Sequence, residues 1–266
     1  MNNIVVTGST RGIGLALAME FVRQGQNVVI SGRAQPDCDR AVNAVAAQSQ
    51  GSQVIGVACD MQELDQIQNL WDTAAEKLGS VDIWINNAGQ AHGTHRFWEQ
   101  PTDRIRDVIG TNLTGLMLAC HVAINGMLRQ GQGAIYNLSG FGRNGMRRDG
   151  MSIYGTSKRG VDYLTKALAR ELRDTDILMC QMNPGMIVTD MLREGYETTV
   201  QDPEFVRRTY NMLSDLPEDA ADFLVREVLA NTRNGVLINR QPRYRVMLRL
   251  LKGMLGGGSR EVFKPE

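Results

Sequence analysis

The sequence predicts an α/β fold of the doubly wound kind, with one parallel sheet of about seven strands in a single domain. Short runs rich in Val and Ile alternate with longer amphipathic segments of helical period. Strands that are apolar throughout are typical of a parallel sheet covered by helices on both faces. Right-handed crossovers then give the doubly wound arrangement. Since no Pro/Gly/Ser-rich linker interrupts the alternation, we expect one domain.

The expected elements follow in order along the chain. Each strand is a short, mostly apolar run, and each helix repeats apolar residues at three- and four-residue spacing. The expected strands are 4–6, 28–30, 53–58, 82–85, 134–138, 177–182 and 236–238. The helices that follow them are expected at 12–24, 36–49, 63–78, 101–130, 152–173 and 217–231.

Two segments fall outside this alternation. Residues 185–216 follow the sixth strand and mix methionine, leucine and charge with weak helical signals, so we expect a substrate-binding lid there. Residues 240–266 combine basic and apolar residues ahead of a Gly-Gly-Gly run, which predicts a C-terminal amphipathic extension. A basic amphipathic helix fits a peripheral membrane contact, a cover over the active site or a subunit contact, and the sequence leaves these three open.

The composition limits the partners. The chain has 266 residues, and its 29 basic and 29 acidic side chains cancel, which argues against nucleic acid as a partner. The N-terminus runs directly into the first apolar strand without the pattern of a signal peptide, so we expect a cytoplasmic location. The cysteines are far apart and lack metal-ligand spacing, which predicts buried thiols and no metal site: Cys38, Cys59, Cys120 and Cys180.

A glycine-rich turn, VVTGSTRGIG, follows the first strand and opens the first helix. Gly8, Gly12 and Gly14 let the backbone turn tightly, approach a pyrophosphate and pack helix against strand. Free N–H groups at the start of the helix then face the phosphates. The turn therefore predicts a dinucleotide site, to which the residues between the glycines also contribute: Ser9, Thr10, Arg11 and Ile13.

The end of the second strand indicates which nucleotide binds. An acidic residue about 20 positions after the glycines would hold the ribose 2′-hydroxyl of NAD. Here the strand ends VVISGRA, with Arg33 and no carboxylate. Arg33 and Arg11 can place guanidinium donors on a 2′-phosphate, so NADP(H) is preferred over NAD(H). Asp60, at the end of the third strand, is positioned to accept from the adenine amine.

Together these features resemble the short-chain dehydrogenase/reductase family over residues 3–239. The resemblance implies a Rossmann-like domain across residues 1–239 and NADPH/NADP+ as cofactor. The motifs that carry it are Thr7-Gly8-x-x-x-Gly12-x-Gly14, Asn86-Asn87-Ala88-Gly89, Asn112 in TNLTG, Tyr154-x-x-x-Lys158, and Asn183-Pro184-Gly185 followed by Thr189. It also implies cofactor contacts from Met61, Asn87, Ala88, Gly89, Tyr154, Lys158, Pro184, Gly185, Ile187 and Thr189.

The family resemblance assigns the catalytic roles. Tyr154 would give its proton to the carbonyl oxygen during reduction, Lys158 would hold the nicotinamide ribose, and Asn112 would keep a proton-relay water. An ammonium group one helical turn from a tyrosine is expected to lower the tyrosine pKa from about 10.

The serine position departs from the family pattern. The family usually places a substrate-polarising serine second in a Ser-Ser pair after the fifth strand. Here NLSGFG puts Ser139 in the first slot and Gly140 in the second. Two interpretations stay open: Ser139 reaches the carbonyl, or it caps the strand and Ser152 or a backbone N–H polarises the oxygen.

The chain is also similar to the chlorophyll(ide) b reductase branch in DIWINNAG, NLSGFG, NPGMIVTDML and its arginine- and tyrosine-rich tail. This implies NADPH-dependent reduction of the 7-formyl group of chlorophyll(ide) b, with a tetrapyrrole as the small-molecule substrate. Two alternatives stay open: a generic carbonyl or 3-oxoacyl reductase or alcohol dehydrogenase, and a catalytically weak nucleotide-binding scaffold. A homo-oligomer is expected. Methionines near the expected mouth of the site fit a large apolar substrate: Met146, Met151, Met186, Met191 and Met212.

Overall fold

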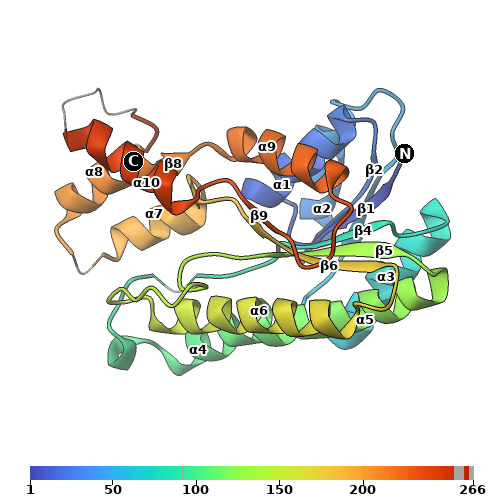
Figure 1. Cartoon of the computed structure of the whole chain (residues 1–266), viewed down its shortest axis with the longest axis horizontal. Coiled ribbons are helices and arrows are strands. Elements are labelled where there is room, and N and C mark those ends of the chain that lie inside the picture. The colour runs from blue at the N-terminus through green and yellow to red at the C-terminus, as the bar shows by residue number, and fades with distance from the viewer. Residues whose placement is uncertain (92, 200, 255–260, 264–266) are drawn as a thin grey trace.

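A computed structural model, which describes residues 1–91, 93–199, 201–254 and 261–263, confirms the doubly wound α/β fold (Figure 1). Within these residues, one sheet contains seven parallel strands in the order β3-β2-β1-β4-β5-β6-β9. The strands are β1 (Asn3–Val6), β2 (Asn27–Gly32), β3 (Val54–Ala58), β4 (Ile83–Asn86), β5 (Gly133–Leu138), β6 (Ile177–Asn183) and β9 (Leu237–Asn239).

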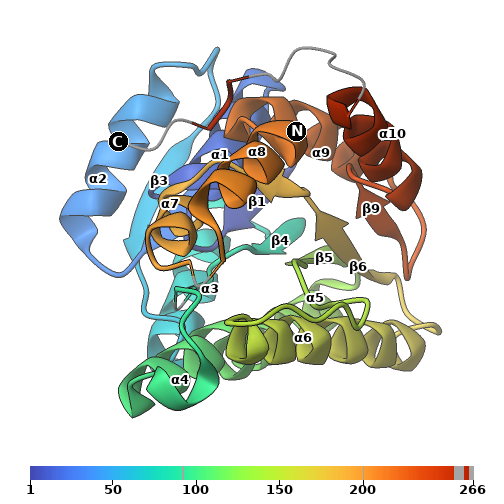
Figure 2. The same ribbon diagram turned by 90° about the vertical axis from the view of Figure 1, so that its left-hand side faces the viewer.

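Helices cover both faces of this sheet, as Figures 1 and 2 show. Each face has its own core, because the strands are apolar on both sides and need two layers of helices to bury them. One core is built with α1 (Gly12–Arg23), α2 (Gln35–Ala46) and α9 (Pro217–Ala230). The other is built with α3 (Leu64–Leu78), α5 (Leu116–Gln130) and α6 (Ser152–Glu171).

The chain order reverses between β1 and β4, which are neighbours in the sheet. Their register pairs Val6 with Ile85, so both strands end at the same edge. In doubly wound sheets ligands bind in the crevice beyond the carboxyl ends of the strands at such a point. The fold therefore places the glycine loop after β1 beside the segment that follows β4.

The stretch 101–130, expected as one helix, is helical without a break from Thr102 to Gln130, but its middle is not regular α-helix. It contains α4 (Thr102–Ile109), a π-helical turn η2 (Gly110–Gly115) and α5. Gly115 packs so closely that a Cβ added there would lie 2.3 Å from the carbonyl oxygen of Met61. Such π turns often occur at functional sites, and this one contains Asn112.

Within the described part of the chain, the continuous stretch Thr102–Gln130 is the one helix whose length and hydropathy would allow it to cross a membrane. Half of its most apolar window is buried inside the protein. Its residues Leu116, Ala119 and Ala123 belong to the core between the sheet and α3. The stretch therefore fits a core helix of the domain.

The segments expected as lid and tail gather at one end of the sheet (Figure 1). A two-stranded parallel pair joins the two ends of the lid segment. A small separate core connects the lid to the tail and is formed by Val188, Val206, Tyr210 and Phe263. Residues 255–260 and 264–266 of the tail, with the expected Gly-Gly-Gly turn, lie outside the described residues. The elements of this region are β7 (Met186–Ile187), α7 (Asp190–Glu197), α8 (Pro203–Leu213), β8 (Ser214–Asp215) and α10 (Arg243–Met254).

Candidate active site

The glycine loop packs tightly against the segment after β4. Gly8 has φ of +61°, and a Cβ there would lie 2.7 Å from Cα of Ala88. A Cβ at Gly14 would lie 2.5 Å from the carbonyl oxygen of Gly8. Both positions therefore exclude a side chain. Gly8 has a left-handed backbone and lies against Ala88, and Gly14, at the start of α1, lies against the glycine loop itself.

Hydrogen bonds hold these two segments together. Thr7 Oγ1 accepts from the backbone N–H groups of Asn87 and Ala88, at 3.1 Å each. Asn87 Nδ2 donates to the carbonyl oxygens of Thr7 at 2.8 Å and Gly8 at 2.9 Å. Ser9 connects the loop to β2, since its hydroxyl accepts from the N–H of Ser31 at 3.0 Å. These contacts fix the shape of the glycine loop.

The loop fits a dinucleotide. Arg11 occupies the N-cap position of α1, and within the described residues no side chain caps the first turn of this helix. The N–H groups of that turn are therefore available to phosphate oxygens. Asn87 Oδ1 is buried and has no hydrogen-bond partner among the described residues, so it can accept from a bound group.

The residues expected to contact the adenosine end lie around this loop. Arg33 is exposed just beyond β2, and Asp60 lies after β3, where its Oδ1 accepts from the N–H of Gln62 at 3.0 Å. Arg11 pairs with Asp190 of α7 at 3.2 Å, and both side chains are largely exposed. A 2′-phosphate that recruits Arg11 would compete with this ion pair.

The segment before α7 reaches the glycine loop from the other side. A Cβ added to Gly12 would lie 3.3 Å from Cγ2 of Thr189. Gly185 has φ of +88°, and the N–H of Met186 donates to Oε1 of Gln241 at 3.1 Å. The structure thus brings the stretch from Pro184 to Thr189, which includes the buried Ile187, to the cofactor crevice. Met61 is also buried, with its carbonyl against the π turn.

Asn112 connects three segments through its side chain. Its Oδ1 accepts from the N–H of Gln90 at 2.7 Å, and its Nδ2 donates to the carbonyl oxygen of Gln90 at 2.9 Å and to the hydroxyl of Ser157 at 3.3 Å. The side chain is fully buried. Asn112 therefore fixes the chain after Gly89 against the first turns of α6.

Tyr154 and Lys158 lie one turn apart near the start of α6. Lys158 Nζ donates to the carbonyl oxygen of Leu138 at 3.0 Å and lies 5.7 Å from the centre of the Tyr154 ring. Burial raises the pKa of Tyr154 to about 12 and lowers the pKa of Lys158 to about 8. In the protein chain by itself, desolvation therefore reverses the expected lowering of the tyrosine pKa, and at neutral pH Tyr154 keeps its proton.

Ser139 is used as a strand-end cap. Its hydroxyl donates to the carbonyl oxygen of Met182 at 3.0 Å, and only 3% of the residue is exposed. Gly140 has no room for a side chain, because a Cβ there would lie 2.7 Å from the hydroxyl oxygen of Tyr154. The geometry supports the second of the two interpretations of this serine.

Several site residues were not found from the sequence. Gln90 and Ser157 hold Asn112. Thr94 ties the segment after β4 to the end of α7, because its backbone N–H donates to the hydroxyl of Thr198 and its own hydroxyl donates to the carbonyl oxygen of Thr198. Gln90 directly follows the Asn-Asn-Ala-Gly motif, which could have singled it out. The contact between Thr94 and Thr198 joins residues 104 positions apart and leaves no local signal.

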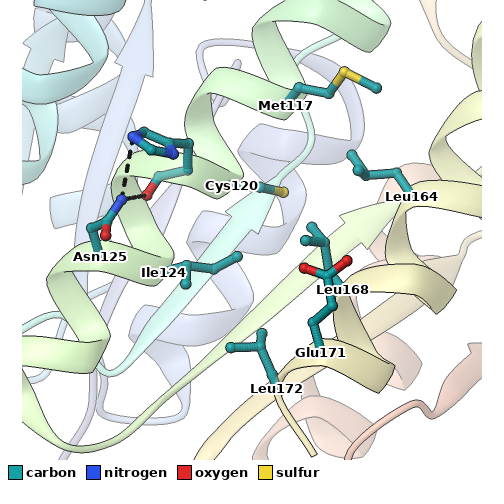
Figure 3. A pocket seen from close by; sticks show the side chains of 9 residues that line it. Met117, Cys120, Ile124, Asn125, Leu164, Leu168, Glu171 and Leu172 are labelled. Atoms are coloured by element: carbon teal, nitrogen blue, oxygen red, sulfur yellow. Dashed lines mark hydrogen bonds between the residues drawn. The ribbon is translucent and has the colours of Figure 1, made fainter.

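A cavity of about 310 Å³ lies elsewhere, between α5 and α6. Figure 3 shows Met117 and Cys120 of α5 facing Leu164 and Leu168 of α6 across it. Leu164 is ten residues beyond Tyr154, which corresponds to about 15 Å along the helix axis. The cavity is therefore separate from the catalytic pair.

Comparison with known proteins agrees with this geometry. The family model for short chain dehydrogenases matches residues 2–199. Chlorophyll(ide) b reductase NOL of Oryza sativa subsp. japonica is 37% identical over 95% of this chain and 72% of its own length. The 3-oxoacyl-(acyl-carrier-protein) reductase FabG of Staphylococcus epidermidis is 34% identical over 70% of this chain and 75% of its own length.

A solved structure shares both fold and sequence. The actinorhodin polyketide ketoreductase with NADPH has a TM-score of 0.79 and 27% identity, covering 90% of this chain and 95% of that chain. The match to the family model and these relatives show that the chain belongs to the short-chain dehydrogenase/reductase family, whose members are oxidoreductases that bind a nicotinamide cofactor and act on carbonyl or hydroxyl groups of small molecules.

Proposed function

We propose that this protein is an NADPH-dependent reductase of a large aldehyde, the 7-formyl group of chlorophyll(ide) b. The observation that supports this substrate is the share of the chain that is similar to known chlorophyll(ide) b reductases. Two plant chlorophyll(ide) b reductases match 95% of the chain at 37% identity. The staphylococcal 3-oxoacyl reductases match 70% of the chain at 34% identity or 85% at 30% identity. The similarity to the plant enzymes is therefore not confined to the cofactor-binding part of the chain.

The preference for NADPH rests on the surroundings of the ribose. The carboxyl end of β2 offers Arg33 and no carboxylate, and Arg11 lies in the neighbouring glycine loop. Guanidinium groups bind phosphate through charge-assisted hydrogen bonds, whereas the 2′-hydroxyl of NADH is usually held by a carboxylate.

The chain's own residues position the substrate and supply the proton. When bound, the nicotinamide supplies a hydride to the carbonyl carbon. Tyr154, protonated at neutral pH, donates its proton to the carbonyl oxygen, and the Lys158 ammonium group helps to hold the cofactor ribose.

The carbonyl oxygen also needs a second donor. Ser139 donates to the carbonyl oxygen of Met182. The backbone N–H groups of Gly140 and Phe141 donate to no acceptor within the described residues, and a Cβ at Gly140 would lie 2.7 Å from the Tyr154 hydroxyl oxygen. We assign the polarising role to these two N–H groups, which can act on developing negative charge as an oxyanion hole does.

A substrate comparison tests the proposal. The purified protein is given chlorophyllide b, a 3-oxoacyl thioester and a small ketone, each with NADPH and with NADH. We expect the highest kcat/KM for chlorophyllide b with NADPH. A higher kcat/KM for the thioester would favour the second candidate, a 3-oxoacyl reductase, which the similarity to the staphylococcal enzyme supports. NADPH binding without turnover of any of the three would contradict both.

A further inference from the structure

Helix α10 is attached to the lid region, residues 185–216, through Arg249. Arg249 Nη1 donates to the carbonyl oxygen of Leu213 at 3.0 Å, and its Nη2 donates to both carboxylate oxygens of Asp215 at 3.0 Å. Asp215 is 2% exposed and also pairs with Arg240, just before the helix. Because a buried carboxylate requires such partners, this cluster fixes which side of α10 faces the protein.

The chain after α10 is attached to the same region. Phe263 is buried between Tyr196 and Tyr210, with ring centres 5.2 Å from each. Its N–H donates to Oδ1 of Asn211 at 2.7 Å. The segment that contains α10 is therefore held at both ends.

This attachment leaves the apolar side of α10 exposed. The exposed fractions are 61% for Tyr244, 64% for Met247, 53% for Leu248 and 46% for Leu251. Their spacing of three, four and seven residues places them along one stripe of the helix. An amphipathic helix normally turns such a stripe toward the core, so here the usual orientation is inverted.

The charges on α10 indicate what covers this stripe. The segment 243–254 contains no acidic residue, and Arg243 and Arg245 are exposed beside the stripe. A second copy of the chain meeting this helix about a two-fold axis would bring arginines against arginines. A lipid surface offers negative headgroups to the arginines and an acyl region to the stripe.

We propose that α10 docks on an anionic lipid surface, with Tyr244, Met247, Leu248 and Leu251 inserted at the boundary between headgroups and acyl chains. The helix lies beside α8 at one end of the sheet, so the docked protein brings this part of the lid region close to the membrane (Figure 1). The proposal does not depend on the identity of the substrate.

Vesicle flotation of the full chain tests the docking. Vesicles of phosphatidylcholine with phosphatidylglycerol are compared with phosphatidylcholine alone. We expect binding to the anionic vesicles that weakens as salt is raised. The double variant Met247→Glu/Leu251→Glu should bind at least about tenfold more weakly, and Arg243→Gln/Arg245→Gln should weaken binding and reduce its dependence on salt.

A matched control carries two glutamates at apolar positions exposed elsewhere, Leu64→Glu/Tyr163→Glu, and should bind vesicles like the wild type. NADPH binding, followed by cofactor fluorescence, checks that each variant retains its fold. Unchanged flotation of Met247→Glu/Leu251→Glu would overturn the proposal. A second result would also overturn it: a wild-type protein that does not bind vesicles but forms a dimer in light scattering, with the dimer lost in Met247→Glu/Leu251→Glu.

Discussion

Tyr154 and Lys158 lie one helical turn apart. Burial raises the pKa of the tyrosine and lowers the pKa of the lysine, so both shifts favour the uncharged form of the group. Tyr154 therefore holds, at neutral pH, the proton that the reduction of a carbonyl group requires. The desolvated lysine carries a cost in stability that depends on pH.

That dependence can be measured by replacing the lysine. The pKa of Lys158 is about 8 in the folded chain, against about 10.4 when unfolded. Below pH 8 the lysine is protonated in both the folded and the unfolded protein, and the free-energy cost of burying its charge is fully present. As the pH rises from about 8 to about 10.4, the lysine of the folded protein loses its proton first, and this cost disappears. We expect Lys158→Met to be more stable than wild type at pH 7, with a smaller difference at pH 10, in urea unfolding. Lys77→Met, on the surface of α3, is the control, and an equal difference at both pH values would contradict the burial of a charged lysine.

Replacing Ser139 and replacing Gly140 should have different effects on catalysis if the serine does not polarise the carbonyl oxygen. Ser139→Ala removes one hydrogen bond to Met182 and should lower the free energy of unfolding by about 1 kcal/mol, with kcat within about threefold of wild type. Gly140→Ala should lower kcat more strongly, because its Cβ would displace the Tyr154 hydroxyl. A hundredfold loss of kcat in a folded Ser139→Ala protein would return the polarising role to the serine.

Arg33 determines the cofactor preference in this account. A charge-assisted hydrogen bond to phosphate contributes about 1.5 to 3 kcal/mol, so Arg33→Asp should lower kcat/KM for NADPH by about 10- to 100-fold. The value for NADH should not fall, because aspartate can accept from the 2′-hydroxyl. Arg129→Asp, the same charge change at an exposed position of α5, serves as control. An unchanged ratio of NADPH to NADH would contradict the assignment.

At the scale of elements, the segment 261–263 stabilises α7 and α8 through Phe263. Phe263 packs between α7 and α8, and truncating a buried phenylalanine to alanine costs about 3 kcal/mol or more. We expect Phe263→Ala to raise amide hydrogen exchange in 190–213 while exchange in the central sheet stays unchanged. Phe205→Ala, at an exposed position of α8, should leave both regions unchanged. Equal exchange of α7 and α8 in wild type and Phe263→Ala would show that the tail does not stabilise them.

Some secondary-structure elements could be predicted from the sequence and others could not. Strands with buried Val and Ile on both faces, such as β1 and β2, could be recognised locally, because a parallel sheet requires continuous apolar runs. The π turn at 110–115 could not, since it depends on the contact of Gly115 with the distant Met61. The orientation of α10 depends on Arg249 meeting Asp215, 34 residues earlier, so the sequence predicted the helix but not which side is exposed.

In the candidate site too, the residues that stand in sequence motifs could be predicted, and the features that depend on distant contacts or burial could not. The glycine loop, Asn112, Tyr154 and Lys158 stand in motifs, and the structure brings them to one end of the sheet. The capping role of Ser139 was visible in the sequence only as one of two alternatives, because it depends on the carbonyl of Met182 in the neighbouring strand. The pKa of Tyr154 depends on burial, which spacing along a helix does not reveal.

At the scale of the whole molecule, α7, α8 and α10 gather at one end of the sheet (Figure 1). Arg11 of the glycine loop pairs with Asp190 of α7, and α10 is bound through Asp215 to the strand that follows α8. The glycine loop, the segment 185–216 and the tail are therefore joined by a series of contacts.

The most direct test of the central claim follows the pigment spectrum of chlorophyllide b mixed with purified protein and NADPH, in parallel with NADH and with the Tyr154→Phe variant. The account predicts a shift toward the 7-hydroxymethyl product with NADPH, a slower shift with NADH, and at least about a hundredfold lower rate for Tyr154→Phe, since a general acid contributes about 10²- to 10⁴-fold. No shift by a protein whose NADPH binding is confirmed by fluorescence, or an undiminished rate for Tyr154→Phe, would contradict it.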